Sequence, residues 1–166
     1  IEEEFALRGQ IEALVRRATT KEEVYKGALG CLLKLSELAR ESRGLVFEAD
    51  PKRSVLVLKA TSGMFSREFL RDEALIPYGR CLCGRAAVEQ QVLVCEHCHT
   101  DPRHENKWLG MKSHGHYTIP LVSSKGLQGV INLYSDAGIH ADQKRTGLLA
   151  EIGNALGEAL LHLQEG

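Results

Sequence analysis

The sequence predicts an α+β domain, because helical stretches lie at both ends of the chain and two pairs of short β-strands lie between them. The helical stretches place apolar residues every three or four positions, and each strand pair surrounds a short polar turn. At 166 residues the chain has the length of one domain and can bury roughly 68–70% of the surface that it exposes when unfolded. A chain of this size folds without disulfide bonds or structural metal ions, so its cysteines are free for chemistry.

Two helices are expected before the first strand. Apolar residues between positions 7 and 18 recur at helical spacing, with charged residues between them. Thr20 and Glu23 then form a capping box, which predicts the start of a second helix. The apolar pattern after this capping box extends the second helix to about Arg40.

The two strand pairs predict antiparallel hairpins. Residues 44–60 contain two β-rich runs around Asp50-Pro51-Lys52-Arg53, and residues 117–134 contain two more around Ser123-Ser124-Lys125-Gly126. Between the hairpins we expect a short helix after Cys83 and a short strand before Cys95. A final amphipathic helix is predicted from about Ala141.

Composition excludes several classes of protein. The net charge is −1 and the basic residues are dispersed, which argues against nucleic-acid binding. No apolar stretch approaches the roughly 20 residues of a membrane helix, and the start of the chain resembles neither a signal peptide nor an initiator methionine. An odd number of cysteines at close spacing is typical of metal or redox chemistry in a reducing compartment. We therefore expect a cytoplasmic fragment of a longer protein.

Cysteines and histidines gather in the segment Cys81–His116. This segment holds four of the five cysteines and five of the seven histidines, and it includes about twenty residues without periodicity, from Glu96 to Gly115. Loops of that length inside compact domains are usually functional or disordered. The residues concerned are Cys81, Cys83, Cys95, Cys98, His97, His99, His104, His114 and His116.

The element order and several motifs resemble the GAF domain family. The segment Cys83-Gly84-Arg85-Ala86-Ala87 resembles the family's Gly-x-x-Gly-x-x-Ala helix start, with Cys81 in place of the first glycine. Thr100-Asp101-Pro102-Arg103 resembles its Asp-x-x-x-Asp-Pro-Arg loop, with His97 in place of the first aspartate. The hairpin that contains Ile119-Pro120-Leu121-Val122 and Gly129-Val130-Ile131-Asn132-Leu133 resembles its closing strands. The segment from Cys81 to Tyr117 is similar to a cysteine-rich subgroup found in bacterial signalling proteins such as sensor kinases and cyclases.

The resemblance implies a central antiparallel sheet of five or six strands, with helices on one face and a loop-roofed ligand pocket on the other. It implies a non-enzymatic sensor or regulator of a small-molecule, redox or gas signal. Residues 1–20 would form a signalling and dimerisation helix, and residues 21–166 the GAF domain. The terminal helices would pair in a homodimer and lead to an output domain on the same chain.

The leading hypothesis for the cysteines is one metal site formed by Cys81, Cys83, Cys95 and Cys98. Four thiolates select zinc or an iron-sulfur cluster, and zinc is the commoner structural occupant of a closed four-cysteine site. Zinc would hold the loop closed, whereas an iron-sulfur cluster would make the domain a redox or gas sensor. The alternative is that the four thiols are reduced, partly buried and without metal.

Two further interpretations stay open. Cys95-Glu96-His97-Cys98-His99 matches the attachment pattern of c-type haem, for which His104, His114 or His116 would supply the second axial ligand. The segment around Cys83 also resembles free methionine sulfoxide reductases, GAF enzymes with reactive thiols in this region. A helix N-terminus lowers the pKa of a thiol, which favours such chemistry. The acidic and serine-rich stretch of those enzymes is replaced here by His114-Gly115-His116-Tyr117.

The remaining candidates are expected to support the site. His114 and His116 are two residues apart, so both face the pocket if the strand begins early enough. His104 is either a hydrogen-bonding residue of the loop or a donor to a ligand thiolate. Residues Arg103, Trp108 and Tyr117 line the pocket or pack in the loop. His97 and His99 are expected to be exposed.

Overall fold

The computed structural model describes residues 2–35, 43–105, 114–136, 138 and 142–165, and every structural statement below refers to them. The six-stranded sheet has the strand order β3-β2-β1-β6-β5-β4, with antiparallel pairing throughout. It confirms the α+β class and the predicted number of strands. In chain order the elements are α1 (Glu2–Arg17), α2 (Lys21–Leu32), β1 (Gly44–Asp50), β2 (Val55–Ser62), α3 (Arg67–Asp72), β3 (Leu75–Pro77), α4 (Cys81–Glu89), β4 (Leu93–Cys95), β5 (Gly115–Ser123), β6 (Gly126–Ser135) and α5 (Gln143–Glu165).

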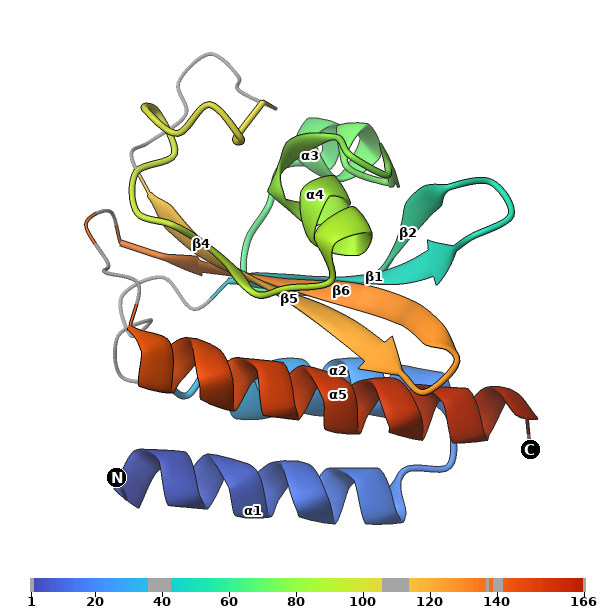
Figure 1. Cartoon of the computed structure of the whole chain (residues 1–166). Coiled ribbons are helices and arrows are strands. Elements are labelled where there is room, and N and C mark those ends of the chain that lie inside the picture. Colours follow the sequence, from blue (N-terminus) through green and yellow to red (C-terminus); the bar gives the residue numbers. More distant parts are fainter. Residues whose placement is uncertain (1, 36–42, 106–113, 137, 139–141, 166) are drawn as a thin grey trace.

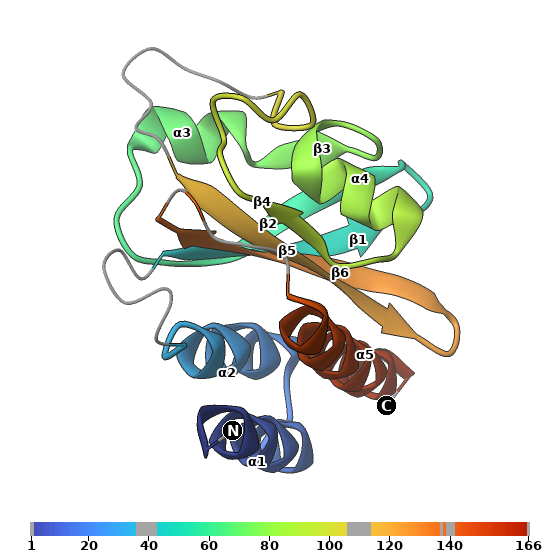
Figure 2. The same ribbon diagram turned by 60° about the vertical axis from the view of Figure 1, so that its left-hand side comes forward.

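The sheet separates two layers (Figure 1). Helices α2 and α5 lie side by side on one face, with α1 beneath them, whereas α3, α4 and the loop after β4 lie on the other face (Figure 2). Both faces are buried. Along β5, Tyr117 and Ile119 face the helical layer, and His116 and Thr118 face α4.

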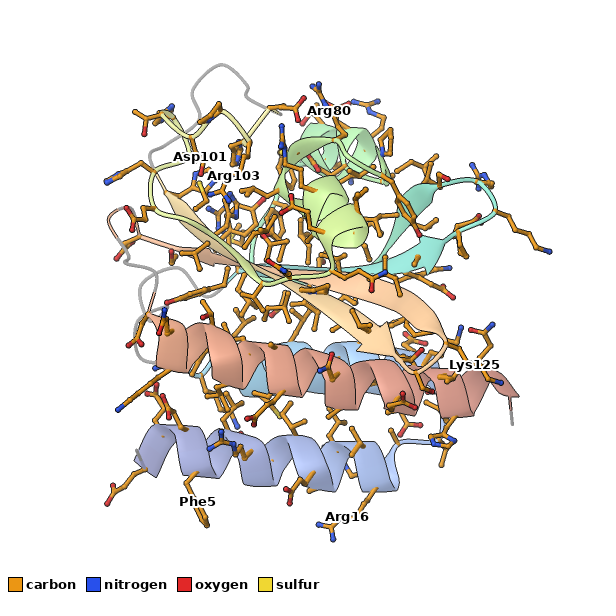
Figure 3. All side chains as sticks on the ribbon, viewed as in Figure 1. Phe5, Arg16, Arg80, Asp101, Arg103 and Lys125 are labelled. Atoms are coloured by element: carbon orange, nitrogen blue, oxygen red, sulfur yellow. The ribbon has the colours of Figure 1, made fainter. Side chains whose placement is uncertain are left out.

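The helical layer has its own hydrophobic core. Leu7, Ile11 and Leu14 of α1 are at most 3% exposed and pack in the cluster that also contains α2 and α5. Phe5 is 79% exposed and points away from the sheet (Figure 3). The apolar stripe of α1 is therefore covered within the chain. The division of the chain at residue 20 and the dimer stay predictions.

Helix α2 begins where the capping box predicted, because Thr20 Oγ1 accepts a hydrogen bond from the Glu23 amide at 3.2 Å. It ends at Leu32, earlier than the predicted Arg40. The amides of Lys34 and Leu35 bond three residues back, a tightening typical of helix ends. The rest of the predicted extension lies outside the described residues.

Helix α5 crosses β5 closely. A Cβ at Gly157 would collide with the backbone of Val122, so the close approach requires glycine. None of the described helices combines the length and the apolar composition that a membrane span needs.

Candidate functional site

The two cysteine pairs lie at the element ends that the sequence predicted. Cys81 is the first residue of α4, and Cys95 is the last residue of β4. The chain then forms a loop whose described part, residues 96–105, is called the roof loop below. Strand β5 begins at Gly115, early enough to include His116.

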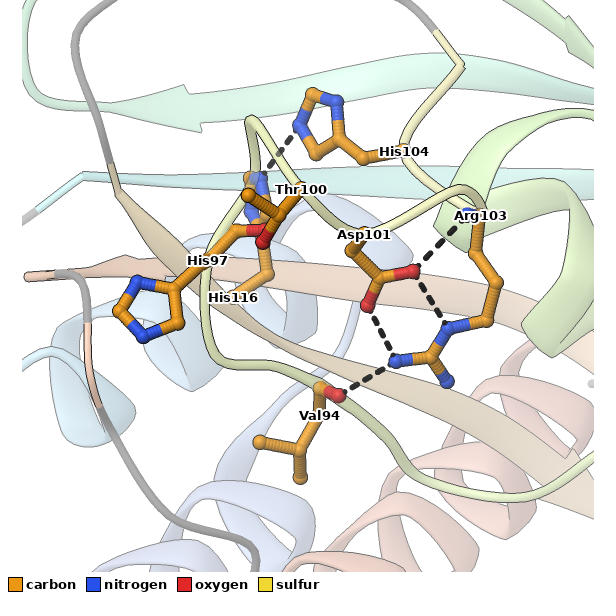
Figure 4. Close-up of polar contacts among 7 residues, drawn as sticks. All are labelled: Val94, His97, Thr100, Asp101, Arg103, His104 and His116. Atoms are coloured by element: carbon orange, nitrogen blue, oxygen red, sulfur yellow. Dashed lines mark hydrogen bonds and ion pairs between the residues drawn. The ribbon is translucent and has the colours of Figure 1, made fainter.

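Three histidines meet beneath the roof loop and form what we call the histidine cluster: His104, His114 and His116. The Nε2 atom of His116 lies 2.9 Å from Nε2 of His104 and 2.8 Å from Nε2 of His114. All three side chains are buried, with exposures of 5%, 6% and 1% in chain order. His114 and His116 share a face of the extended chain. The roof loop carries His104 onto His116 (Figure 4).

Cys98 is fixed beside this cluster. Its amide donates to the carbonyl of His114 at 2.8 Å, and its sulfur accepts from the His114 amide at 3.1 Å. The same sulfur lies 3.0 Å from Nδ1 of the His114 ring. Both ring nitrogens of His114 therefore have close polar neighbours.

All four cysteines of the predicted metal site are buried free thiols. Burial, together with the nearby Cys81 and Glu73, raises the pKa of Cys83 well above its ordinary value. Burial and the neighbouring Asp101 carboxylate raise the pKa of Cys95 to about 12. These environments disfavour the thiolate as long as no cation is bound.

A set of potential metal ligands does form, but from histidines. In the described part of the chain, His104, His114 and His116 are the set of three or more His, Cys, Asp or Glu side chains whose ligand atoms all lie within 4.8 Å of one another. The four sulfur atoms are not brought together in this way. A site of four cysteines, with zinc or an iron-sulfur cluster, therefore stays a prediction.

Arg103 anchors the roof loop to the sheet and does not join the histidine cluster. It donates to Asp101 through Nη2 at 2.6 Å and Nε at 3.0 Å, and Nη2 also donates to the Val94 carbonyl at 2.8 Å (Figure 4). These bonds from Arg103 hold the pKa of Asp101 at about 2. Arg103 therefore packs in the loop, and it also lines an open cavity of about 240 Å³ on the outer side of the roof loop, together with Val94, Glu96, His97, Thr100 and Asp101. A ligand-binding role for Arg103 stays a prediction.

Two other predicted pocket residues have different outcomes. Tyr117 is 1% exposed and packs in the core of the helical layer, so its prediction as a pocket residue is wrong. The reason is the strand alternation, which puts Tyr117 on the face opposite to His116. Trp108 lies outside the described residues. His97 and His99 are exposed, as predicted.

Glu105 is a residue that the sequence reasoning missed. Its carboxylate accepts a hydrogen bond from the Cys81 amide at 3.0 Å and forms an ion pair with Arg80 at 2.9 Å. A carboxylate at the N-terminus of a helix is favoured by the helix dipole. Because Glu105 is far from α4 in sequence, no local capping pattern could have identified it.

Cys81 has an unusual backbone conformation. Its φ angle is +58°, in the left-handed region that normally favours glycine. This agrees with the resemblance, in which a glycine occupies the same position. The strained residue lies at the edge of a cavity of about 20 Å³, roughly the space of one water molecule. Its lining residues are Phe69, Glu73, Ile76, Cys81, Leu82, Cys83, His104, His116, Asn132 and Tyr134.

Solved structures of GAF domains and GAF enzymes have a similar fold. The GAF domain of a phosphoenolpyruvate-protein phosphotransferase from Coxiella burnetii gives a TM-score of 0.81 at 17% identity, over 99% of this chain and 96% of that one. Free methionine-R-sulfoxide reductase from Neisseria meningitidis, in complex with its substrate, gives 0.74 at 20% identity, over 95% and 87%. The nlh2 GAF domain of A. aeolicus in an inactive state gives 0.72 at 17% identity, over 96% of each chain.

These structural similarities establish the fold but not an activity, because identities near 20% connect sensors and enzymes alike. Comparison with curated proteins found no matching sequence. A sequence profile described as the GAF domain matches residues 18–161, which is most of the chain. The chain therefore belongs to the GAF domain family.

Proposed function

We propose that this chain is a regulatory GAF domain that responds to a small ligand beneath the roof loop and catalyses no reaction. The observation that carries the proposal is that side chains fill most of the space between the sheet and the roof loop. Buried side chains of α4, β5 and the roof loop occupy the space over the sheet, and the cavity beside Cys83 measures about 20 Å³. Sites for drug-sized molecules measure about 300–1,000 Å³. An ion or a molecule of a few atoms fits this cavity.

A methionine sulfoxide reductase is the second candidate, favoured by the placement of Cys81 and Cys83 at the start of α4. The reaction requires an exposed thiol that can attack the sulfoxide sulfur. Cys83 is only 4% exposed, and the cavity beside it is far smaller than free methionine sulfoxide. The geometry therefore supports the regulatory role better than the enzyme.

The two candidates are separated by a turnover assay. Reduction of free methionine-R-sulfoxide is followed as NADPH consumption coupled through thioredoxin, with Cys83→Ser as the matched control. We expect no rate above that control. Turnover that depends on Cys83 would overturn the regulatory proposal.

The regulatory role also includes a homodimer through the terminal helices, an output domain on the same chain and a cytoplasmic location in a bacterial signalling protein. The odd number of cysteines and their close spacing support a reducing compartment. The outward face of α1, where Phe5 is 79% exposed, offers apolar surface for pairing. Sedimentation over a range of concentrations tests the dimer, and a monomer throughout would contradict it.

The haem alternative has less support. Cys95 and Cys98 are both fully buried, and the sulfur of Cys98 already contacts His114, whereas His99 is exposed. Covalent attachment would need both sulfur atoms and the His99 ring on one haem. The absorption spectrum of the purified protein tests this directly, because haem gives a Soret band.

A further inference from the structure

We propose that the histidine cluster is a binding site for one divalent first-row transition-metal ion, held by the Nε2 atoms of His104, His114 and His116. The inference rests on the proposed function only in naming what the domain senses. It replaces the cysteine set predicted from the sequence with a set of imidazole ligands. Imidazole nitrogen suits zinc, copper, iron and nickel.

The strongest argument is the crowding of nitrogen atoms around His116. Its Nε2 atom lies 2.8 Å from one imidazole nitrogen and 2.9 Å from another. A ring nitrogen carries either one proton or one lone pair, so it can form one good hydrogen bond and not two. In every protonation state of the cluster, the two contacts must share the single proton or the single lone pair of His116 Nε2, so they cannot both be good hydrogen bonds. A cation at the centre removes this conflict, because three lone pairs can then point at the same ion.

The distances agree with metal coordination. Two nitrogens 2.8–2.9 Å apart subtend about 90° at an ion that lies about 2.0–2.1 Å from each of them. This is the angle between neighbouring ligands of an octahedral or tetragonal site. A tetrahedral site needs nitrogens about 3.3–3.4 Å apart, which a shift of about 0.5 Å in the rings would provide.

Cys98 supports this arrangement because it contacts the Nδ1 atom of His114, the ring nitrogen that does not bind the metal. When Nδ1 of His114 donates to the sulfur 3.0 Å away, Nε2 of the same ring keeps the lone pair that a metal needs. The His114 amide donates to the same sulfur at 3.1 Å, so two contacts from the Cys98 sulfur hold His114 in this orientation.

The fourth ligand position has room for a very small molecule. The cavity of about 20 Å³ is lined by His104 and His116, and its volume corresponds to one water molecule. Sites with three protein ligands commonly keep such a position for water or another small ligand. The sensed species is therefore the metal ion itself or a ligand of a few atoms bound to it.

The test uses the untagged chain, freed of metal with a chelator and titrated with Co²⁺ and Zn²⁺. We expect about one ion per chain, and the Co²⁺ form should show visible ligand-field bands. His104→Gln, His114→Gln and His116→Gln should each weaken binding by more than roughly 100-fold, the upper limit for losing a residue that only hydrogen-bonds to a metal ligand. Cys98→Ser should weaken it by about 10–100-fold.

The matched controls are Cys81→Ser, Cys83→Ser and Cys95→Ser, which should bind as the parent does. If these three variants lose binding while the histidine variants keep it, the four-cysteine site is correct and this proposal is wrong. No binding by the parent chain also overturns it, yet leaves the proposed regulatory function untouched, because that function is tested by turnover.

X-ray absorption of the Zn²⁺-loaded parent keeps the test independent of variant folding. A first shell of nitrogen or oxygen near 2.0–2.1 Å supports the histidine site. A first shell dominated by sulfur near 2.3 Å overturns it.

Discussion

Replacing Asp101 with asparagine should destabilise the chain at neutral pH by removing the charged partner of Arg103. The bonds from Arg103 hold the pKa of Asp101 at about 2, below its ordinary value of 3.8, and the Asp101 side chain is only 13% exposed. At about 1.4 kcal/mol per pKa unit, this difference corresponds to about 2 kcal/mol of folding stability at pH 7. We therefore expect Asp101→Asn to lower the free energy of unfolding by about 2 kcal/mol.

The lowered pKa of Asp101 also predicts how the stability difference between parent and variant changes with pH. The pKa is lower in the folded chain, so the stabilisation is fully present above the unfolded pKa of about 3.8 and is lost as the pH falls through about 2. The difference between parent and Asp101→Asn should therefore shrink to about half near pH 3. Urea denaturation at pH 7, 5 and 3 measures it, with Asp72→Asn on the exposed face of α3 as the control. A difference that does not change between pH 7 and pH 3 would refute the reasoning.

Three further predictions concern the surroundings of the site. Cys81→Gly should be about 1 kcal/mol more stable than Cys81→Ala in urea denaturation, because glycine relieves the left-handed backbone; equal stabilities would contradict this. Glu105→Gln should cost about 0.5–1 kcal/mol and speed amide exchange at the start of α4, whereas unchanged exchange would show that Glu105 does not hold the helix. Ile11→Ala should cost about 2–4 kcal/mol, because the side chain is 2% exposed; a loss below about 1 kcal/mol would mean that α1 does not pack as described.

Most of the fold could be predicted from local patterns. The capping box at Thr20 and the turn Ser123-Ser124-Lys125-Gly126 between two strands depend only on neighbours in sequence, and both are confirmed. Strand β3 was not predicted, because it has three residues and its pairing with β2 depends on tertiary structure. The end of α2 was placed too late for a similar reason, since its apolar pattern continues to Leu35, which is buried without being part of the helix.

The candidate site was less predictable than the fold. Spacing indicated that Cys95 and Cys98 lie close together, and that His114 and His116 share a face. It could not indicate which of these groups a distant loop would cover. The roof loop brings His104 onto the two strand histidines, so that the set of ligand atoms forms across twelve residues of sequence separation. Short spacing favoured the cysteines in the prediction, whereas the fold of the roof loop brings three histidines together.

The conformation of Cys81 explains why the family has a glycine at this position and what its replacement by cysteine costs. A non-glycine residue with φ near +60° costs about 1–2 kcal/mol, and such strain persists only where the surrounding structure fixes it. Here the Glu105 carboxylate binds the Cys81 amide, so the roof loop holds the strained turn from outside the helix. Glycine would satisfy the backbone at lower cost but would leave the cavity wall without a thiol. Cys81 therefore keeps a buried thiol in the cavity wall at the cost of a strained backbone, which the contact from the roof loop stabilises.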